Sequence, residues 1–114
     1  MNTFNEKDWK LFREKLPQWQ ESHMEKLCRE YLEILGRDTQ PSERFWELDK
    51  RINSDKHHLE LRGRMSRSNM DINIIGFIRE NVITLDDLLE FSDELQNHMR
   101  LIVERTSMIF DDYE

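Results

Sequence analysis

The stretch Ile83-Thr-Leu-Asp-Asp-Leu-Leu-Glu-Phe-Ser-Asp-Glu-Leu95 decides the fold class, because it combines a helix start with an apolar stripe. Thr84 is a suitable N-cap residue, Asp87 stands three positions later, and Ile83 and Leu88 occupy the two positions of a hydrophobic staple. Apolar or small side chains then recur at helical spacing, at Leu85, Leu88, Leu89, Ser92, Leu95, Met99, Ile102 and Val103. The pattern predicts an α-helix that begins at Thr84 and continues to about residue 105.

A shorter helix is predicted directly before this stretch. Ser66 or Ser68 can cap its start, and Asn81 is a residue type that tolerates the left-handed conformation at a helix end. The predicted buried face consists of Met70, Ile74, Ile75 and Ile78. The short connection over residues 81–84 predicts that these last two helices are close neighbours.

The N-terminal third of the chain also has helical periodicity. Asn5 is a good N-cap, and the next apolar side chains share one helix face at Trp9, Phe12 and Leu16. Pro17 either kinks one long helix or occupies the first turn of a second one. A further stripe runs to Gly36, which predicts a helix end there.

Pro41 can open the next helix, whose apolar positions are Phe45, Leu48 and Ile52. This helix is predicted to reach about residue 53 and can extend to residue 58. Residues 53–65 remain open between helix, loop and a short extended piece at residues 59–61.

These signals together predict an all-α fold, a compact bundle of four to five helices with negligible strand. Only five residues are Gly or Pro, which favours helices over turns and strands. We expect one domain over residues 1–114, with residues 106–114 as a frayed acidic tail. The predicted core is Trp9, Phe12, Leu27, Tyr31, Phe45, Leu48, Ile52, Ile75, Ile78, Leu88, Leu95 and Ile102.

The composition indicates in which cellular compartment the protein is expected. The single cysteine, Cys28, cannot form an internal disulfide, and the first ten residues have no apolar signal core. No apolar run approaches the ~20 residues that cross a bilayer. We expect a cytoplasmic protein.

The net charge of −7 is unevenly distributed. Residues 50–70 hold six basic and two acidic side chains, whereas residues 71–114 hold 11 acidic and three basic ones. The acidic part should repel nucleic acid and attract basic protein surfaces.

The last two predicted helices resemble a helix-turn-helix in spacing, but the second is too acidic to read DNA. The same carboxylates can imitate a row of phosphates and occupy a basic groove on another protein. The alternative is an ordinary solvated surface. The candidate partner-binding residues of this acidic face are Asp86, Asp87, Glu90, Asp93 and Glu94.

The basic segment is a second candidate site. Its side chains can contact phosphates, or they can belong to a solvated loop. The candidate nucleic-acid contacts are Lys50, Arg51, Lys56, Arg62, Arg64 and Arg67.

We find no residue pattern for catalysis, for a metal or for a cofactor. His57 and His58 are adjacent, so on a helix their side chains diverge by about 100°, while His23 and His98 are isolated. Cys28 lies on an apolar helix face, where a free cysteine behaves as a small apolar residue. The tryptophans are expected to belong to the core rather than to a ligand cage.

Several strings together resemble a known family: Asp8-Trp-Lys-Leu-Phe-Arg13, Trp19-Gln-Glu21, Pro41-Ser-Glu-Arg-Phe-Trp-Glu-Leu48, Met65-Ser-Arg-Ser-Asn69, Ile83-Thr-Leu-Asp-Asp-Leu88 and Phe91-Ser-Asp-Glu-Leu95. The chain resembles short proteins on integrative and conjugative elements and plasmids of Gram-positive gut bacteria, whose common label, "multidrug transporter", conflicts with the residues here. Small acidic helical proteins of such elements are similar to anti-CRISPR inhibitors of type II systems.

The resemblance implies a non-enzymatic, protein-binding inhibitor that blocks guide RNA or DNA engagement by a type II RNA-guided nuclease. Such a nuclease holds nucleic acid in a positively charged channel, which suits an acidic ligand. The alternatives are a nucleic-acid-binding regulator that uses residues 50–67, and a structural accessory protein of the mobile element. We expect a monomer or a homodimer.

Overall fold

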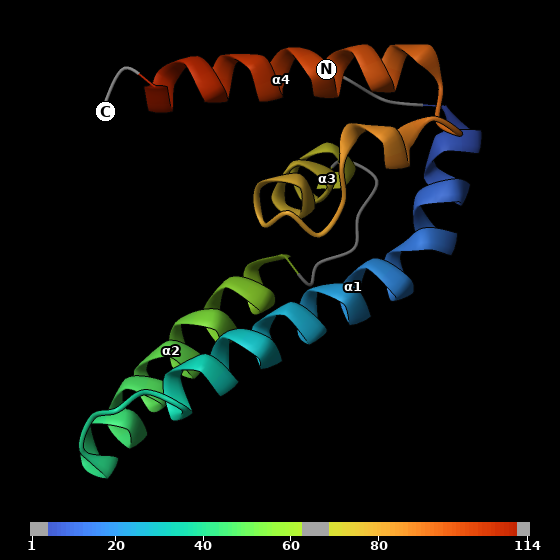
Figure 1. The fold of residues 1–114 in the computed structure, drawn as a ribbon. Helices are drawn as coiled ribbons and strands as arrows, with labels where there is room; N and C mark the ends of the chain where they lie inside the picture. The colour runs from blue at the N-terminus through green and yellow to red at the C-terminus, as the bar shows by residue number, and fades with distance from the viewer. Residues whose placement is uncertain (1–4, 63–68, 112–114) are drawn as a thin grey trace.

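The protein is all-α in the part of the chain that the computed structural model describes, which is residues 5–62 and 69–111 (Figure 1). Within these residues there is no strand, so the predicted fold class is confirmed. No described helix combines the length and apolar content that crossing a membrane requires. The elements are α1 (Glu6–Leu35), α2 (Pro41–Arg62), α3 (Met70–Arg79), the short 3-10 helix η2 (Leu85–Leu88) and α4 (Asp93–Asp111).

α1 begins as its sequence predicts and continues through its proline. The side-chain oxygen of Asn5 accepts a hydrogen bond from the backbone N–H of Asp8 at 2.7 Å. Pro17 lies inside this one helix of 30 residues, so it does not start a second helix. The first turns of α1 run at an angle to the remainder (Figure 1), as a proline that removes a backbone hydrogen bond explains.

α3 has Arg79 as its last residue, and Asn81, the predicted left-handed residue, terminates it two positions later. Asn81 has a φ of 59°, in the left-handed region. The N–H of Val82 donates to the carbonyl of Phe77 at 2.9 Å, and the N–H of Asn81 donates to that of Ile78 at 3.0 Å. These two bonds form the Schellman motif, which satisfies the last carbonyls of the helix.

One hydrophobic core holds together the first half of α1, α3, η2 and α4. Its fully covered members come from all four elements, but none comes from α2. The half-buried Trp9, Ile78 and Ile102 pack against it. The core consists of Phe12, Leu16, Trp19, Met70, Ile74, Ile75, Phe77, Ile83, Leu88, Phe91, Leu95 and Met99.

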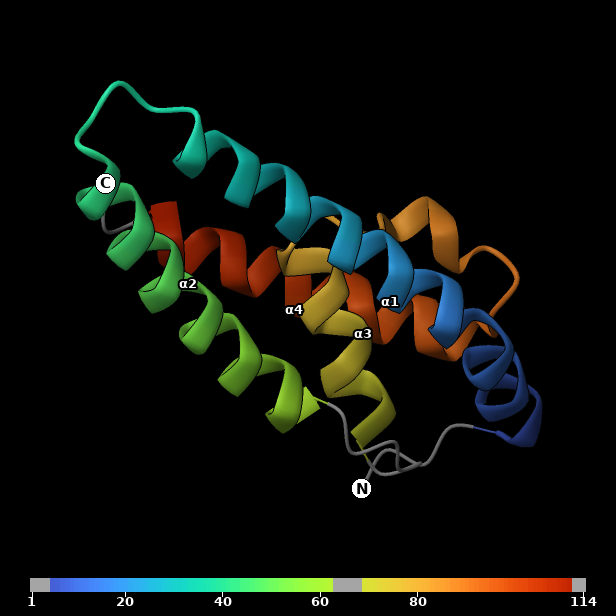
Figure 2. The same cartoon turned by 90° about the horizontal axis from the view of Figure 1, so that it is seen from below.

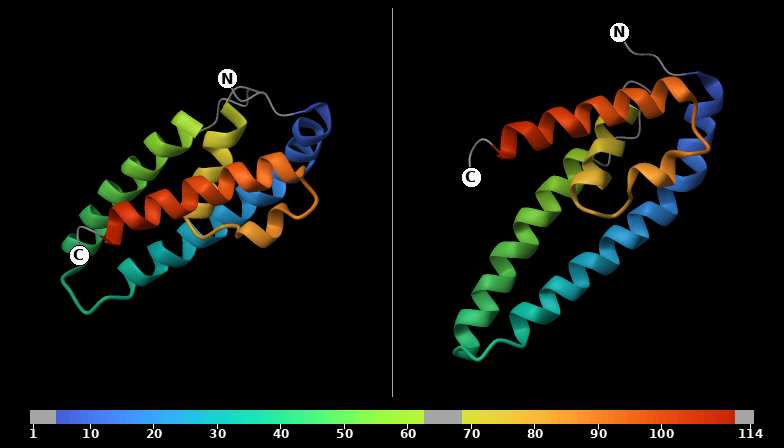
Figure 3. Two further views of the ribbon diagram at one scale, coloured as in Figure 1. Left: turned by 90° about the horizontal axis from the view of Figure 1, so that it is seen from above. Right: turned by 45° about the horizontal axis from the view of Figure 1, so that its top comes forward.

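The second half of α1 and all of α2 form an antiparallel hairpin that projects from this core (Figures 2 and 3). We call this hairpin, residues 21–62, the arm. It makes the molecule 52 Å long against 34 and 23 Å in the other directions. On its α1 half the arm buries the apolar residues Leu27 and Ile34.

The arm departs from the predicted core. Phe45 was expected to be buried, but it is 60% exposed, because α2 packs mainly against α1 among the described elements. Tyr31, Leu48 and Ile52 are only half-buried. Of the twelve predicted core residues, those confirmed as buried are Phe12, Leu27, Ile75, Leu88 and Leu95.

The segment that the sequence left open is partly resolved as helix. α2 continues to Arg62, so residues 59–61 are not extended. The expected caps Ser66 and Ser68 lie outside the described residues. α4 continues to Asp111 and therefore includes most of residues 106–114, which were expected to fray.

Candidate functional site

The five acidic residues predicted to bind a partner do not lie on one helix. Asp86 and Asp87 belong to η2, Glu90 lies in the following turn, and Asp93 and Glu94 form the first turn of α4. The prediction of a single helix from Thr84 is therefore wrong, although all five side chains are exposed. We call these five residues the acidic corner.

The capping chemistry predicted at Thr84 is present, but it starts only one turn. The carboxylate of Asp87 accepts hydrogen bonds from the backbone N–H and the hydroxyl of Thr84, at 2.7 and 3.3 Å. One 3-10 turn follows and ends at Leu88. The capping box is therefore a correct local prediction attached to a shorter element.

A second cap, which sequence reasoning missed, restarts the helix. The hydroxyl of Ser92 accepts a hydrogen bond from the N–H of Leu95 at 3.2 Å, so Ser92 caps α4. The signal was present in the sequence, because Ser92 is followed by the acids Asp93 and Glu94, which favour a helix start.

Asp8 fixes this restart from the other end of the chain. Its two carboxylate oxygens accept hydrogen bonds from the backbone N–H of Ser92 at 2.8 Å and from its hydroxyl at 2.6 Å. Asp8 is 1% exposed. The carboxylate therefore joins the first turn of α1 to the start of α4 and holds the acidic corner on the core.

The acidic corner has few cations of its own. Glu90 pairs with Lys15 at 3.4 Å, and its side chain remains 70% exposed. Within the described residues, Asp86, Asp93 and Glu94 form no ion pair. Most of the negative charge is consequently open to solvent or to a partner.

The basic segment is divided between two uses. Lys50 and Lys56 are exposed on α2. Arg51 instead donates to Glu30 and to Asp55, both at 3.0 Å, and it is an internal contact of the arm.

The other predicted nucleic-acid contacts lie beyond what the structure describes. Arg62 ends α2, but its side chain is not described. Arg64 and Arg67 lie outside the described residues. The predicted row of basic side chains therefore stays a prediction.

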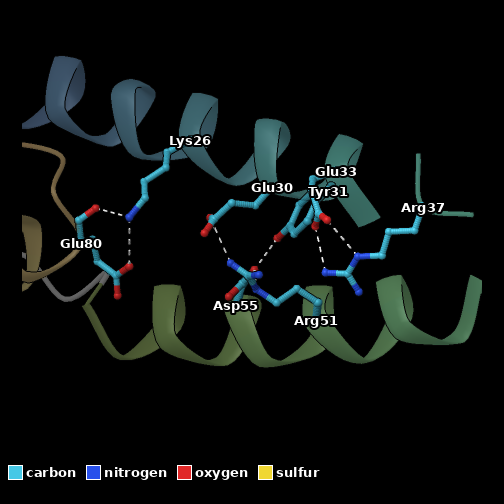
Figure 4. A network of polar contacts seen from close by, with 8 residues as sticks. All are labelled: Lys26, Glu30, Tyr31, Glu33, Arg37, Arg51, Asp55 and Glu80. Atoms are coloured by element: carbon cyan, nitrogen blue, oxygen red, sulfur yellow. Dashed lines mark hydrogen bonds and ion pairs between the residues drawn. The ribbon is translucent and has the colours of Figure 1, made fainter. Parts of the chain in front are cut away.

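Arg51 belongs to a polar network that joins α1 to α2 (Figure 4). The hydroxyl of Tyr31 donates to Asp55 at 2.7 Å. Burial, together with this bond to a carboxylate, raises the pKa of Tyr31 to about 12. Burial alone would lower the pKa of Arg51, but its bonds to Asp55 and Glu30 raise it.

The network continues towards both ends of the arm. Near the tip, Arg37 bonds to Glu33 at 2.8 Å and also contacts Glu47 on α2. The hydrogen bond from Arg37 lowers the pKa of Glu33. At the base, Lys26 donates to the carbonyl of Glu80, which ties α1 to the end of α3.

A groove of about 650 Å³ follows this network between α1 and α2. Three of the five cations that line it, Arg29, Arg37 and Arg51, pair with carboxylates of the arm itself. The groove therefore presents little free positive charge to an anion.

Of the residues considered for metal or nucleophile chemistry, His57 and His58 lie side by side, with their ring centroids 6.2 Å apart. No group of three potential metal ligands occurs among the described residues. Cys28 is exposed rather than packed as a small apolar residue. Trp19 lies in the core as predicted, whereas Trp46 is 64% exposed at the arm.

Comparison with protein-family models, with curated proteins and with solved structures finds no match for this chain.

Proposed function

We propose that the protein is a cytoplasmic, non-enzymatic inhibitor that binds the basic nucleic-acid channel of another protein. The observation that carries this proposal is the acidic corner, five exposed carboxylates within nine residues of chain, of which only Glu90 has a cationic partner in the described residues. Such a surface matches a channel built to hold phosphates.

The acidic corner is also rigidly supported. Leu88 and Phe91, between its acidic residues, and Leu95, directly after them, enter the core with exposed fractions of 0, 4 and 0%. The carboxylate of Asp8 accepts a hydrogen bond from the backbone N–H of Ser92 and so fixes the backbone there. A surface that is ordered before binding loses less conformational entropy when a partner arrives.

The proposed target is a type II CRISPR nuclease. The strings that resemble short proteins of mobile elements suggest this class, and its guide and target strands lie in a positively charged channel. By occupying that channel, the inhibitor would block engagement of guide RNA or DNA.

A cleavage assay tests the proposal. A purified type II nuclease is mixed with increasing protein before guide RNA and before target DNA, and cleaved DNA is measured. Inhibition should weaken as salt is raised, because the contact is between opposite charges. Unimpaired cleavage at every concentration would contradict the proposed target.

Two variants with the same net charge separate the acidic corner from general acidity. The test variant carries Asp86→Lys, Asp93→Lys and Glu94→Lys. The control carries Glu14→Lys, Glu21→Lys and Glu43→Lys, three exposed acids on α1 and α2. Inhibition should disappear in the first variant and persist in the second, with melting curves confirming that both are folded. Equal inhibition by the two variants would show that the corner is not the binding surface.

A further inference from the structure

The two sides of the arm differ in chemistry. On α1, the groove is lined by Lys26, Glu30 and Glu33, which share one side of the helix. The opposite side of the same turns carries Met24 and Cys28, four residues apart, both exposed. The groove side is therefore polar and the other side apolar.

α2 shows the same division. Glu47, Lys50 and Ser54 line the groove. Phe45 and Ile52 recur every seven residues on the other side.

The apolar sides of the two helices open on one face. Met24 of α1 and Leu59 of α2 line the same pocket of about 230 Å³, together with Phe77 of the core. We call this surface the apolar face of the arm, and it comprises Met24, Cys28, Leu32, Leu35, Phe45, Ile52 and Leu59.

The apolar face is large for an uncovered surface. Leu32 is 68% exposed, Phe45 60%, Leu35 43% and Met24 41%. The exposed ring of Trp46 packs edge-on against the ring of Phe45, with the two ring centroids 4.9 Å apart. With about 200 Å² for a fully exposed large side chain, these four residues of the face and the adjoining Trp46 expose on the order of 500 Å². This area is near the upper end of the range for the largest exposed apolar patch on a monomeric protein.

α3 covers the base of this face, where Phe77 lines the pocket with Met24 and Leu59, whereas Leu32, Leu35 and Phe45 stay exposed. α4 lies on the opposite side of α3 from the arm (Figure 1). No side chain of α2 over residues 41–59 is fully buried. Because helices take most of their stability from packing of an apolar face, a helical hairpin with this face open is marginal.

We propose that a second copy of the chain covers the apolar face, so that two arms form a four-helix bundle around a two-fold axis. Two such faces would bury on the order of 1,000 Å² of apolar surface, and a polar rim brings the total into the ~1,200–2,000 Å² of stable interfaces. An uncharged patch is self-complementary, as an isologous contact requires.

The charges beside the stripe fit an antiparallel pairing of α2 with α2 of the second copy. Asp49 and Lys56 are seven residues apart and therefore lie on one side of the helix, and neither forms an ion pair with another described side chain. A two-fold axis near residues 52 and 53 places Asp49 against Lys56 of the second copy, twice in each dimer.

The pairing leaves the acidic corner open. In Figure 1 the start of α4 lies beside the first turns of α1, at the end of the molecule away from the arm tip. A dimer through the arms would thus present two acidic corners.

Sedimentation velocity on the purified full chain tests the pairing directly, without any other partner. Over about 1 µM to 1 mM, a range that covers weak and moderate affinities, the mass should rise from that of one 14.0 kDa chain towards twice that value. One chain mass at every concentration overturns the proposal.

A matched pair of variants locates the contact. Leu32→Glu places a charge on the apolar face, whereas Leu89→Glu places one on an equally exposed leucine outside the arm, at 69% against 68%. The dissociation constant should rise at least about tenfold for Leu32→Glu, since each dimer then buries two charges, and stay unchanged for Leu89→Glu. Equal effects of the two changes refute this interface.

A charge exchange tests the antiparallel register. Asp49→Lys and Lys56→Asp should each weaken the dimer about tenfold, because each places like charges opposite one another twice. The combined variant restores opposite pairs and should return to within about threefold of the original affinity. Additive losses in the combined variant refute the register.

Discussion

Replacing Asp8 with alanine should reduce the free energy of unfolding by about 3 kcal/mol. The carboxylate is 1% exposed and accepts hydrogen bonds from the N–H and the hydroxyl of Ser92. Hydrogen bonds to a charged group contribute about 1.5–3 kcal/mol each. Two such bonds give 3–6 kcal/mol, and water that enters the vacated space moves the expected loss towards the lower figure.

Urea unfolding, followed by circular dichroism, measures this loss of free energy. In a thermal melt, where 1 kcal/mol corresponds to about 4 °C, the melting temperature should fall by about 12 °C. Asp8→Asn keeps the shape but brings an amide NH₂ towards the donors of Ser92, so it should cost about 2 kcal/mol. Glu14→Ala, an exposed acid on the same helix, is the control and should change stability by less than about 0.5 kcal/mol.

A double-mutant cycle with Ser92→Ala isolates the pair. The coupling energy between Asp8 and Ser92 should be about 1–2 kcal/mol, because each residue loses its partner when the other is replaced. A loss below about 1 kcal/mol for Asp8→Ala, or a coupling near zero, would refute the assigned role of Asp8 in fixing the start of α4.

Three further changes test local features. Asn81→Ala should lower unfolding free energy by about 1 kcal/mol, because alanine is strained in the left-handed region, while Asn81→Gly should not; the reverse order in urea unfolding would contradict this account. The pKa of Tyr31 is raised to about 12, so its stabilising contribution is complete below pH 10 and is lost as pH rises towards 12. Between pH 10 and 12 the free energy of unfolding of the wild type should fall by about 1 kcal/mol relative to that of Tyr31→Phe, a figure reduced for solvent screening. An equal change in melting temperature for the two proteins over this pH range would refute the raised pKa. Arg51→Ala leaves Glu30 and Asp55 without their cationic partner, so amide exchange should accelerate in α2 but not in α3.

Local sequence chemistry predicted the helix ends well. Asn5, Asn81 and the pair Thr84 and Asp87 all make the capping contacts expected from their residue types. These features depend on residues within four or five positions of one another. They need no knowledge of the rest of the fold.

The errors arose where distant parts of the chain decide the outcome. The helix predicted from Thr84 is interrupted because Asp8 bonds to Ser92, which lies 84 residues later in the chain, and fixes a new helix start there. Periodicity alone favoured one continuous stripe, because it cannot include a contact made by α1.

The arm illustrates a second limit of periodicity. The spacing of Phe45, Leu48 and Ile52 identifies one side of a helix, but not whether another element covers it. In the described structure α2 packs mainly on α1, so Phe45 stays exposed. The five acids of the acidic corner are exposed, because charged residues rarely enter a core without a partner.

The two proposed surfaces are supported in opposite ways. The acidic corner is attached to buried side chains on both sides of its turn, whereas the arm buries two apolar residues, Leu27 and Ile34, and adds ion pairs at its surface. Surface ion pairs contribute about 0–1 kcal/mol each, and core burial contributes more. A partner on the corner therefore meets a surface that is already ordered, while a second copy on the arm adds the apolar cover that the hairpin lacks. Because the two contacts use different residues, Leu32→Glu should separate the two chains without altering the acidic corner. Asp93→Lys should weaken partner binding at the corner without separating the chains.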